Sequence, residues 1–138
     1  MPTSVLVLTE LKPDQLTVQG LLAVREALER CGYAAVVTSE MDVAIRVLAE
    51  RQIDLIISTL SVDSGTVFDF LSIIKGIGPR ETPVIVMCVC GSMSQDEILS
   101  IACKSSGAQY LNVSDYQPEE LQHELTKRIR VLKQQRFA

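Results

Sequence analysis

The stretch Ile53-Asp54-Leu55-Ile56-Ile57-Ser58-Thr59 decides the fold, because it is a short and almost continuous apolar run that is rich in isoleucine. Such a run is typical of a strand that is covered on both faces of a parallel sheet. Similar runs recur along the chain, and a helix-like stretch follows each one. The other expected strands are Val5 to Leu8, Ala34 to Val37, Val84 to Val89 and Ala108 to Val113.

Helices are expected between these strands, because apolar residues there recur at steps of three and four. Gly32 and Gly107 are expected to end the first and fourth helices. Ser39 and Ser94 are expected N-caps, because an acidic residue follows each of them three positions later. The expected helices are Thr17 to Cys31, a second from Ser39, a third near 66–75 before Gly76-Ile77-Gly78-Pro79, a fourth from Ser94 through Ile98, Ile101 and Ala102 to Gly107, and a fifth from Pro118.

Alternating strands and helices with right-handed crossovers predict an α/β fold, the flavodoxin-like (βα)5 doubly wound parallel sheet of order 2-1-3-4-5. The length of 138 residues predicts one domain over 1–138. Functional residues in such a fold lie at the carboxyl ends of the strands, so those ends are the first place to look for chemistry.

Composition excludes several functional classes. No apolar run is long enough to span a bilayer, and the N-terminus lacks the pattern of a secretory signal, so we expect a cytoplasmic protein. A net charge of −4 argues against a nucleic-acid footprint over the whole domain. The four cysteines lie inside apolar elements, which favours reduced thiols over disulfides.

Basic residues concentrate near the C-terminus, at Lys127, Arg128, Arg130, Lys133 and Arg136. Cations in the last turns of a helix stabilise its macrodipole, so this cluster has a purely structural explanation. The alternative is a local basic patch for nucleic acid, as an exception to the acidic balance of the whole domain.

The chain resembles the receiver domain of bacterial response regulators from Ser4 to about Lys133. The resemblance is carried by the leucine-rich stretch Leu22 to Tyr33, by Asp54 to Ile57, by Pro83 to Val86 and by Tyr116 to Leu121. In that family, two acidic residues after the first strand and an aspartate after the third hold Mg²⁺, and the aspartate accepts phosphate. A hydroxyl residue after the fourth strand and a lysine after the fifth contact the phosphoryl oxygens.

This sequence departs from the family pattern at each of those strand ends. The acidic pair is replaced by Thr9 and Glu10, and the phosphoacceptor is replaced by Thr59. Cys88 stands at the hydroxyl position and Ser114 at the lysine position. Because Mg²⁺ needs several oxygen ligands, we expect no metal, no cofactor and no aspartyl phosphorylation, and the resemblance therefore implies a non-enzymatic pseudo-receiver.

Other candidate chemistry has simpler explanations. Thr59 is a potential kinase site but also a good strand-terminal residue, and Asp63 is an ordinary loop aspartate in the absence of a metal site. Cys88 and Cys90 alternate across the sheet, which keeps them from sharing a metal, although one thiol could sense oxidation. His123 has no neighbouring ligands in the sequence and is expected at the surface.

Three functions follow from this reading. The first is phosphorylation-independent binding of a protein partner, or of a second copy as a homodimer, through the surface of the fourth helix, fifth strand and fifth helix. The second is a small-ligand or redox sensor in the modified pocket, and the third is a receiver phosphorylated at a non-standard residue. The expected partner-binding residues, which include the aromatic switch position at Tyr110 or Leu111, are Tyr110, Gln122, Lys127, Arg128 and Arg130.

Overall fold

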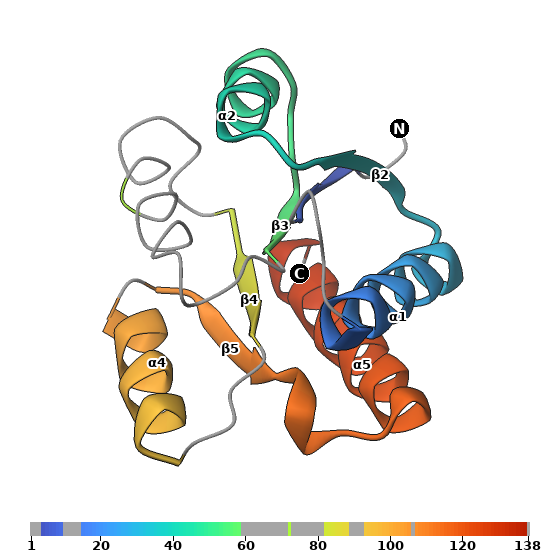
Figure 1. Cartoon of the computed structure of the whole chain (residues 1–138). Helices are drawn as coiled ribbons and strands as arrows, with labels where there is room; N and C mark the ends of the chain where they lie inside the picture. Colours follow the sequence, from blue (N-terminus) through green and yellow to red (C-terminus); the bar gives the residue numbers. More distant parts are fainter. Residues whose placement is uncertain are drawn as a thin grey trace.

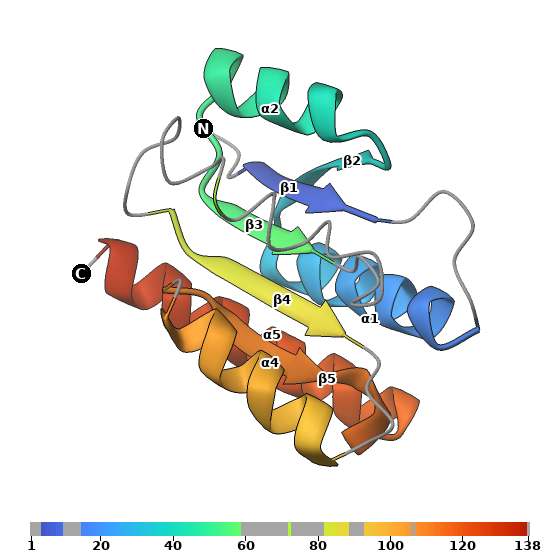
Figure 2. The ribbon, with the colours of Figure 1, turned by 60° about the vertical axis from the view of Figure 1, so that its left-hand side comes forward.

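The computed structural model describes residues 4–9, 15–58, 72, 82–88, 93–105 and 107–137. Within these residues, parallel strands form one sheet of order β2-β1-β3-β4-β5, which confirms the predicted fold (Figures 1 and 2). The strands are β1 Ser4–Leu8, β2 Ala34–Thr38, β3 Leu55–Ser58, β4 Val84–Cys88 and β5 Gln109–Asn112.

The helices cover both faces of the sheet, as Figure 2 shows, with α1 and α5 on one face and α2 and α4 on the other. They are α1 Gln15–Cys31, α2 Met41–Glu50, α4 Met93–Ser105 and α5 Pro118–Phe137, with a short 3-10 helix at Val113–Asp115. The third predicted helix lies almost wholly outside the described residues. None of the described helices combines the length and apolar character that a membrane span requires.

The strands supply two cores because successive side chains point to opposite faces of a strand. Val5 and Val7 pack with α1 and α5, whereas Leu6 and Leu8 pack with α2 and α4. Burial of each such side chain is worth about 1.5–3 kcal/mol, so the continuous apolar runs stabilise both layers at once. The edge strand β2 is the exception, since Val37 remains 55% exposed where no further strand or helix fully covers it.

The fifth helix is anchored as the sequence predicts. Leu121, Leu125 and Ile129 follow at four-residue steps and each is at most 1% exposed. They form one stripe on the face of α5 that meets the sheet and α1. The opposite side of α5 is consequently turned to solvent, which leaves its charged residues available for other roles.

Glycine ends two of the helices as predicted. Gly32 and Gly107 have φ values of +74° and +78°, in the left-handed region that other residues avoid. The N–H of Gly32 donates to the carbonyl of Glu29, and the N–H of Tyr33 donates to the carbonyl of Leu28. This pair of bonds satisfies the last carbonyls of α1 and turns the chain directly into β2.

Several predicted boundaries were wrong. Ser39 does not cap α2: Glu40 occupies the N-cap position without a side-chain bond, and its N–H donates instead to Thr38 Oγ1 at 3.1 Å. Helix α4 begins at Met93, which places Ser94 within its first turn. Strand β3 begins at Leu55 because Asp54 is engaged at the edge, where its N–H donates to the Ser4 carbonyl and its Oδ2 accepts from Ser4 N–H.

Candidate functional site

The carboxyl ends of the parallel strands meet at one edge of the sheet, where the sequence predicted a site. Register places Leu8 beside Ser58, and Cys88 beside Asn112. Thr9 follows β1 directly, and Ser114 follows β5 within the 3-10 helix. The backbone therefore brings these predicted positions to the same edge. Glu10, Thr59, Asp63 and Cys90 lie outside the described residues, and of Cys88 only the backbone is described.

Thr9 is held rigidly at this edge. Its N–H donates to the carbonyl of Thr38 at 2.9 Å, and the residue is only 7% exposed. Its Oγ1 is buried without a hydrogen-bond partner. A hydroxyl buried in this way forfeits the hydrogen bonds that water would supply, which costs about 1–3 kcal/mol. Thr9 is thus a polar side chain at the sheet edge whose bonding capacity is unused.

Ser114 is exposed and sits in the turn that follows β5. Its backbone N–H donates to Asn112 Oδ1 at 3.0 Å, so Asn112 caps the 3-10 helix. Sequence reasoning missed Asn112, although a side chain that bonds the backbone two residues on is the established behaviour of asparagine in turns. The short hydroxyl of Ser114 carries no charge, in contrast to the lysine that the receiver pattern would place there.

The described side chains at this edge do not fit Mg²⁺. The comparison of the sequence with the receiver pattern predicted Thr9, Glu10 and Thr59 at the three carboxylate positions. Among the residues with described side chains, no group of three or more His, Cys, Asp or Glu side chains is placed to hold a metal ion. A hard divalent cation requires more oxygen ligands than one carboxylate provides.

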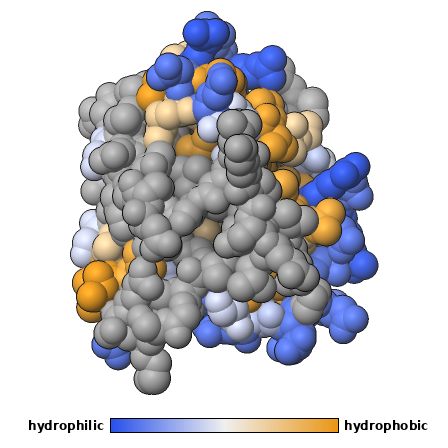
Figure 3. Space-filling model, in the orientation of Figure 1, coloured by the Kyte–Doolittle hydropathy of each residue, from blue (hydrophilic) through white to orange (hydrophobic). Residues whose placement is uncertain are grey.

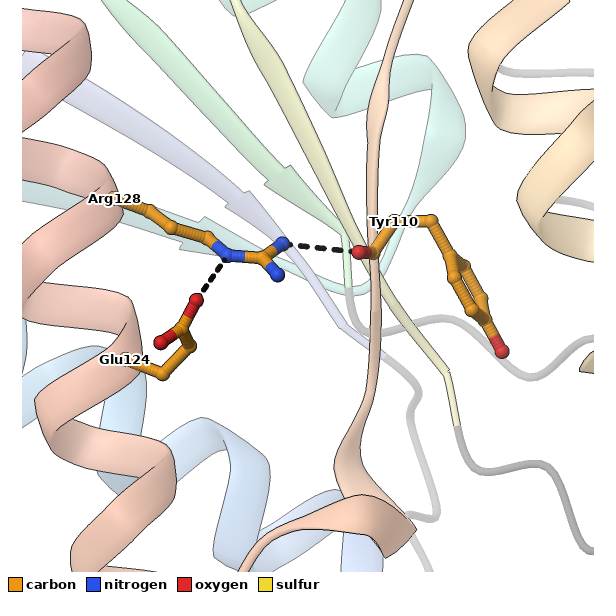
Figure 4. Close-up of polar contacts among 3 residues, drawn as sticks. All are labelled: Tyr110, Glu124 and Arg128. Carbon is orange, nitrogen blue, oxygen red and sulfur yellow. Dashed lines mark hydrogen bonds and ion pairs between the residues drawn. The ribbon is translucent and has the colours of Figure 1, made fainter.

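Arg128 is engaged within the fold rather than being a free surface cation, while its role in partner binding stays a prediction. Its Nη1 donates to the backbone carbonyl of Tyr110 at 2.9 Å, and its Nε donates to Glu124 Oε1 at 2.9 Å (Figure 4). The side chains of Arg128 and Glu124 are only 24% and 26% exposed. A half-buried, charge-assisted pair of this kind ties α5 to the edge strand β5.

Tyr110 and Gln122 also differ from free surface residues. The ring of Tyr110 points away from α5 in Figure 4 and packs, half-buried, against the core beneath α2 and α4. Leu111 is buried in the opposite core, so Tyr110 is the only one of the two candidate switch positions with exposed surface. Gln122 is half-buried with its Nε2 inaccessible, and its role in partner binding stays a prediction.

Helix α4 presents apolar side chains to solvent. Ile98 and Ile101 are 66% and 65% exposed, whereas Leu99 and Cys103 face the core. The apolar patch over α4 is visible in Figure 3. Exposed apolar residues that gather on one helix, rather than scattering singly, commonly mark a contact surface.

Of the two described thiols, that of Cys103 is a poor redox centre. Cys103 is fully buried, and burial raises the pKa of its thiol, which lowers the reactive thiolate fraction. Cys31 is half-buried at the end of α1, and both thiols are free of disulfides, as predicted. His123 is exposed on α5, which also agrees with the sequence.

No protein-family model and no curated protein matches the chain. Solved structures do match. A response regulator from Thermotoga maritima aligns with a TM-score of 0.69 at 22% identity, covering 96% of this chain and 98% of that one. The chemotaxis response regulator CheY4 of Vibrio cholerae aligns with a TM-score of 0.63 at 20% identity, covering 92% and 98%.

A third match is the receiver domain of a sensor histidine kinase from Pseudomonas aeruginosa, which has a magnesium ion coordinated in its active site cleft. Its TM-score is 0.59 at 15% identity, with 92% of this chain and 97% of that chain covered. All three alignments span nearly the whole of both chains. The chain therefore has the fold of the response-regulator receiver domains.

Proposed function

We propose that this chain is a pseudo-receiver that signals by binding a protein partner without being phosphorylated and without acting as an enzyme. The observation that carries the proposal is the combination of a receiver fold with replaced residues at the strand ends. Thr9 stands at a carboxylate position, Thr59 at the phosphoacceptor position and Ser114 at the lysine position.

The replaced residues remove the groups on which phosphoryl transfer depends. Transfer to an aspartate needs the aspartate itself, a cation that bridges the phosphoryl oxygens and positive charge for the transition state. A threonine hydroxyl in place of a carboxylate is a much weaker metal ligand, and the exposed serine offers no charge. We therefore expect no phosphoryl transfer at this edge. In the proposal, the receiver fold serves only as a scaffold for the surface that binds the partner.

The proposed contact surface consists of α4, β5 and the adjoining side of α5. It offers Ile98 and Ile101 as exposed apolar side chains and Tyr110 as a half-exposed aromatic. An aromatic side chain such as tyrosine is often an anchor of a protein interface, and exposed aliphatic side chains add apolar area that a partner can bury. The same surface would serve a homodimer, and the overall net charge of −4 disfavours nucleic acid as the ligand.

The test is capture of the partner with the whole chain, followed by binding measurements on variants. The double change Ile98→Asp and Ile101→Asp should weaken binding at least about tenfold, because it places charge in the apolar contact. The double change Leu22→Asp and Val37→Asp is the matched control, since these residues are 52% and 55% exposed on α1 and β2. Size-exclusion chromatography with light scattering reports whether the partner is a second copy.

Addition of Mg²⁺ and acetyl phosphate should leave the affinity unchanged. The proposal fails if the α4 variant binds normally while Thr59→Ala or Cys88→Ala abolishes binding in a folded chain. A dependence on acetyl phosphate would also contradict it, because binding would then follow phosphorylation.

The buried Thr9 hydroxyl favours one alternative function, a sensor for a small polar ligand at the strand ends. Its Oγ1 has an unused bonding capacity, which a ligand carbonyl or hydroxyl would satisfy. A thermal-shift screen of metabolites under reducing and oxidising conditions distinguishes this function. Stabilisation that disappears in the Thr9→Val variant would support the sensor over the interaction module.

A further inference from the structure

Basic side chains from two helices converge on a hollow that lies apart from the strand-end edge. Helices α1 and α5 pack side by side on one face of the sheet (Figures 1 and 2). Between them is a hollow of about 520 Å³. Its lining consists of Arg30, His123, Thr126, Lys127, Arg130 and Val131.

Among the residues with described side chains, no acidic residue lines this hollow, and two neighbouring carboxylates pair with other arginines. On α1, Glu29 pairs with Arg25 at 3.6 Å rather than with Arg30. On α5, Glu124 pairs with Arg128 at 2.9 Å rather than with Lys127, although Lys127 is one turn away. Among the residues with described side chains, Arg30, Lys127 and Arg130 form no ion pair. Three cations therefore share one hollow in a chain whose net charge is −4.

The helix macrodipole does not explain the whole cluster. Arg30 lies in the last turn of α1, where a cation is favourable. Lys127 and Arg130 lie well inside α5, which continues to Phe137, and the dipole effect is confined to the final turn. Their mutual repulsion is slightly unfavourable for folding, and a bound anion would relieve it.

We propose that this basic groove, defined as Arg30, His123, Lys127 and Arg130, binds an acidic segment of a partner protein. The proposal rests on the proposed function, because it assigns one chemical class of segment to the protein partner. The groove contacts would supplement those of α4 and β5.

The openness of the groove indicates an extended chain rather than a small molecule. All four basic side chains are exposed, whereas a small-molecule site buries most of its ligand. Several carboxylates carried on one peptide would reach Arg30 and Arg130 together, and the partly exposed Val131 would contact an apolar residue between them. The acidic remainder of the chain repels a polynucleotide and an acidic peptide alike, but a peptide can also carry an apolar side chain to meet Val131.

Fluorescence anisotropy with a labelled oligo-glutamate peptide tests the proposal on the full chain. We expect saturable binding that weakens as salt increases, because exposed charges are screened within about 10 Å at 0.1 M ionic strength. The double change Arg30→Glu and Arg130→Glu should reduce the affinity at least about tenfold. The matched control is Arg46→Glu with Arg51→Glu, which alters net charge equally at exposed positions in and after α2; it should reduce affinity less than about threefold.

Charge reversal at the end of α1 could impair folding, and thermal unfolding followed by circular dichroism detects such a loss. The double change Arg30→Gln and Arg130→Gln removes the same two charges without reversing them and serves as the second variant. Equal losses in the groove and control variants would overturn the proposal, because net charge alone would then explain binding. Tighter binding of oligo-thymidine than of oligo-glutamate would overturn it in favour of a nucleic acid. If oligo-glutamate does not bind but the partner still binds through Ile98 and Ile101, the groove proposal fails while the proposed function stands.

Discussion

Two regions of this molecule differ in how their side chains are satisfied. One is the framework of packed helices and strands, and the other is the carboxyl edge of the sheet. In the framework, Leu125 and Ile129 fill the core and Gly32 ends α1 as a receiver fold requires. At the edge, Thr9 is buried with an unsatisfied hydroxyl and Ser114 is an exposed turn residue. The difference teaches that the fold depends on packing and caps, and that it tolerates uncharged residues such as Thr9 and Ser114 at the carboxyl edge.

The largest expected effect belongs to the framework. Replacement of Leu125 by alanine should lower the free energy of unfolding by about 2–5 kcal/mol, because the side chain is completely buried and leaves a cavity. Urea denaturation measures the change. Leu22→Ala removes the same atoms from a side chain that is 52% exposed and should cost no more than about 1 kcal/mol. Equal losses in the two variants would contradict the assigned core.

A smaller effect is expected where α5 is tied to β5. Arg128→Ala should cost about 1–2 kcal/mol, because the change leaves the Tyr110 carbonyl and Glu124 without their charged donor. Arg25→Ala is the matched control, since Arg25 and Glu29 share the same spacing but are 76% and 69% exposed. The control should cost less than about 0.5 kcal/mol. If Arg128→Ala leaves the free energy of unfolding unchanged in urea denaturation, Arg128 does not stabilise the contact between α5 and β5.

At the edge itself the expected effect is close to zero or reversed in sign. Thr9→Val replaces an unpartnered buried hydroxyl by a methyl group, so stability should be unchanged or rise by up to about 1 kcal/mol. Thr126→Val is the control, because Thr126 is equally buried but its Oγ1 donates to the Gln122 carbonyl at 2.8 Å. That variant should lose about 0.5–1.5 kcal/mol. A clear loss for Thr9→Val in thermal unfolding would mean that its hydroxyl has a partner.

The framework could be predicted from sequence because its signals are local and periodic. Apolar runs located each strand to within two residues, and glycines at positions 32 and 107 marked two helix ends. Helix capping was less predictable. The Thr38 hydroxyl accepts a hydrogen bond from Glu40 N–H, and Ser39 does not act as the expected N-cap of α2. The spacing of Ile98 and Ile101 indicated a helix, but apolar spacing alone cannot show which side of a helix faces the sheet, and both side chains are exposed.

The strand-end positions could also be identified from sequence, since each follows an apolar run directly. What sequence could not show was the bonding state of each side chain. Arg128 and Arg130 are near neighbours in a basic run, yet one bonds to Tyr110 and Glu124 and the other lines the basic groove. Their roles depend on a strand and a helix that are distant in sequence, and only the folded arrangement brings these together.

The central claim is that the strand-end edge no longer accepts phosphate, and intact mass spectrometry tests it most directly. The purified chain is incubated with acetyl phosphate and Mg²⁺ beside a receiver that retains its acidic residues and lysine. We expect no phosphoryl adduct on this chain, and none after Thr59→Asp alone, because Thr9, Cys88 and Ser114 would still lack the required groups. A hydroxylamine-labile phosphoryl adduct on the unaltered chain would contradict the account.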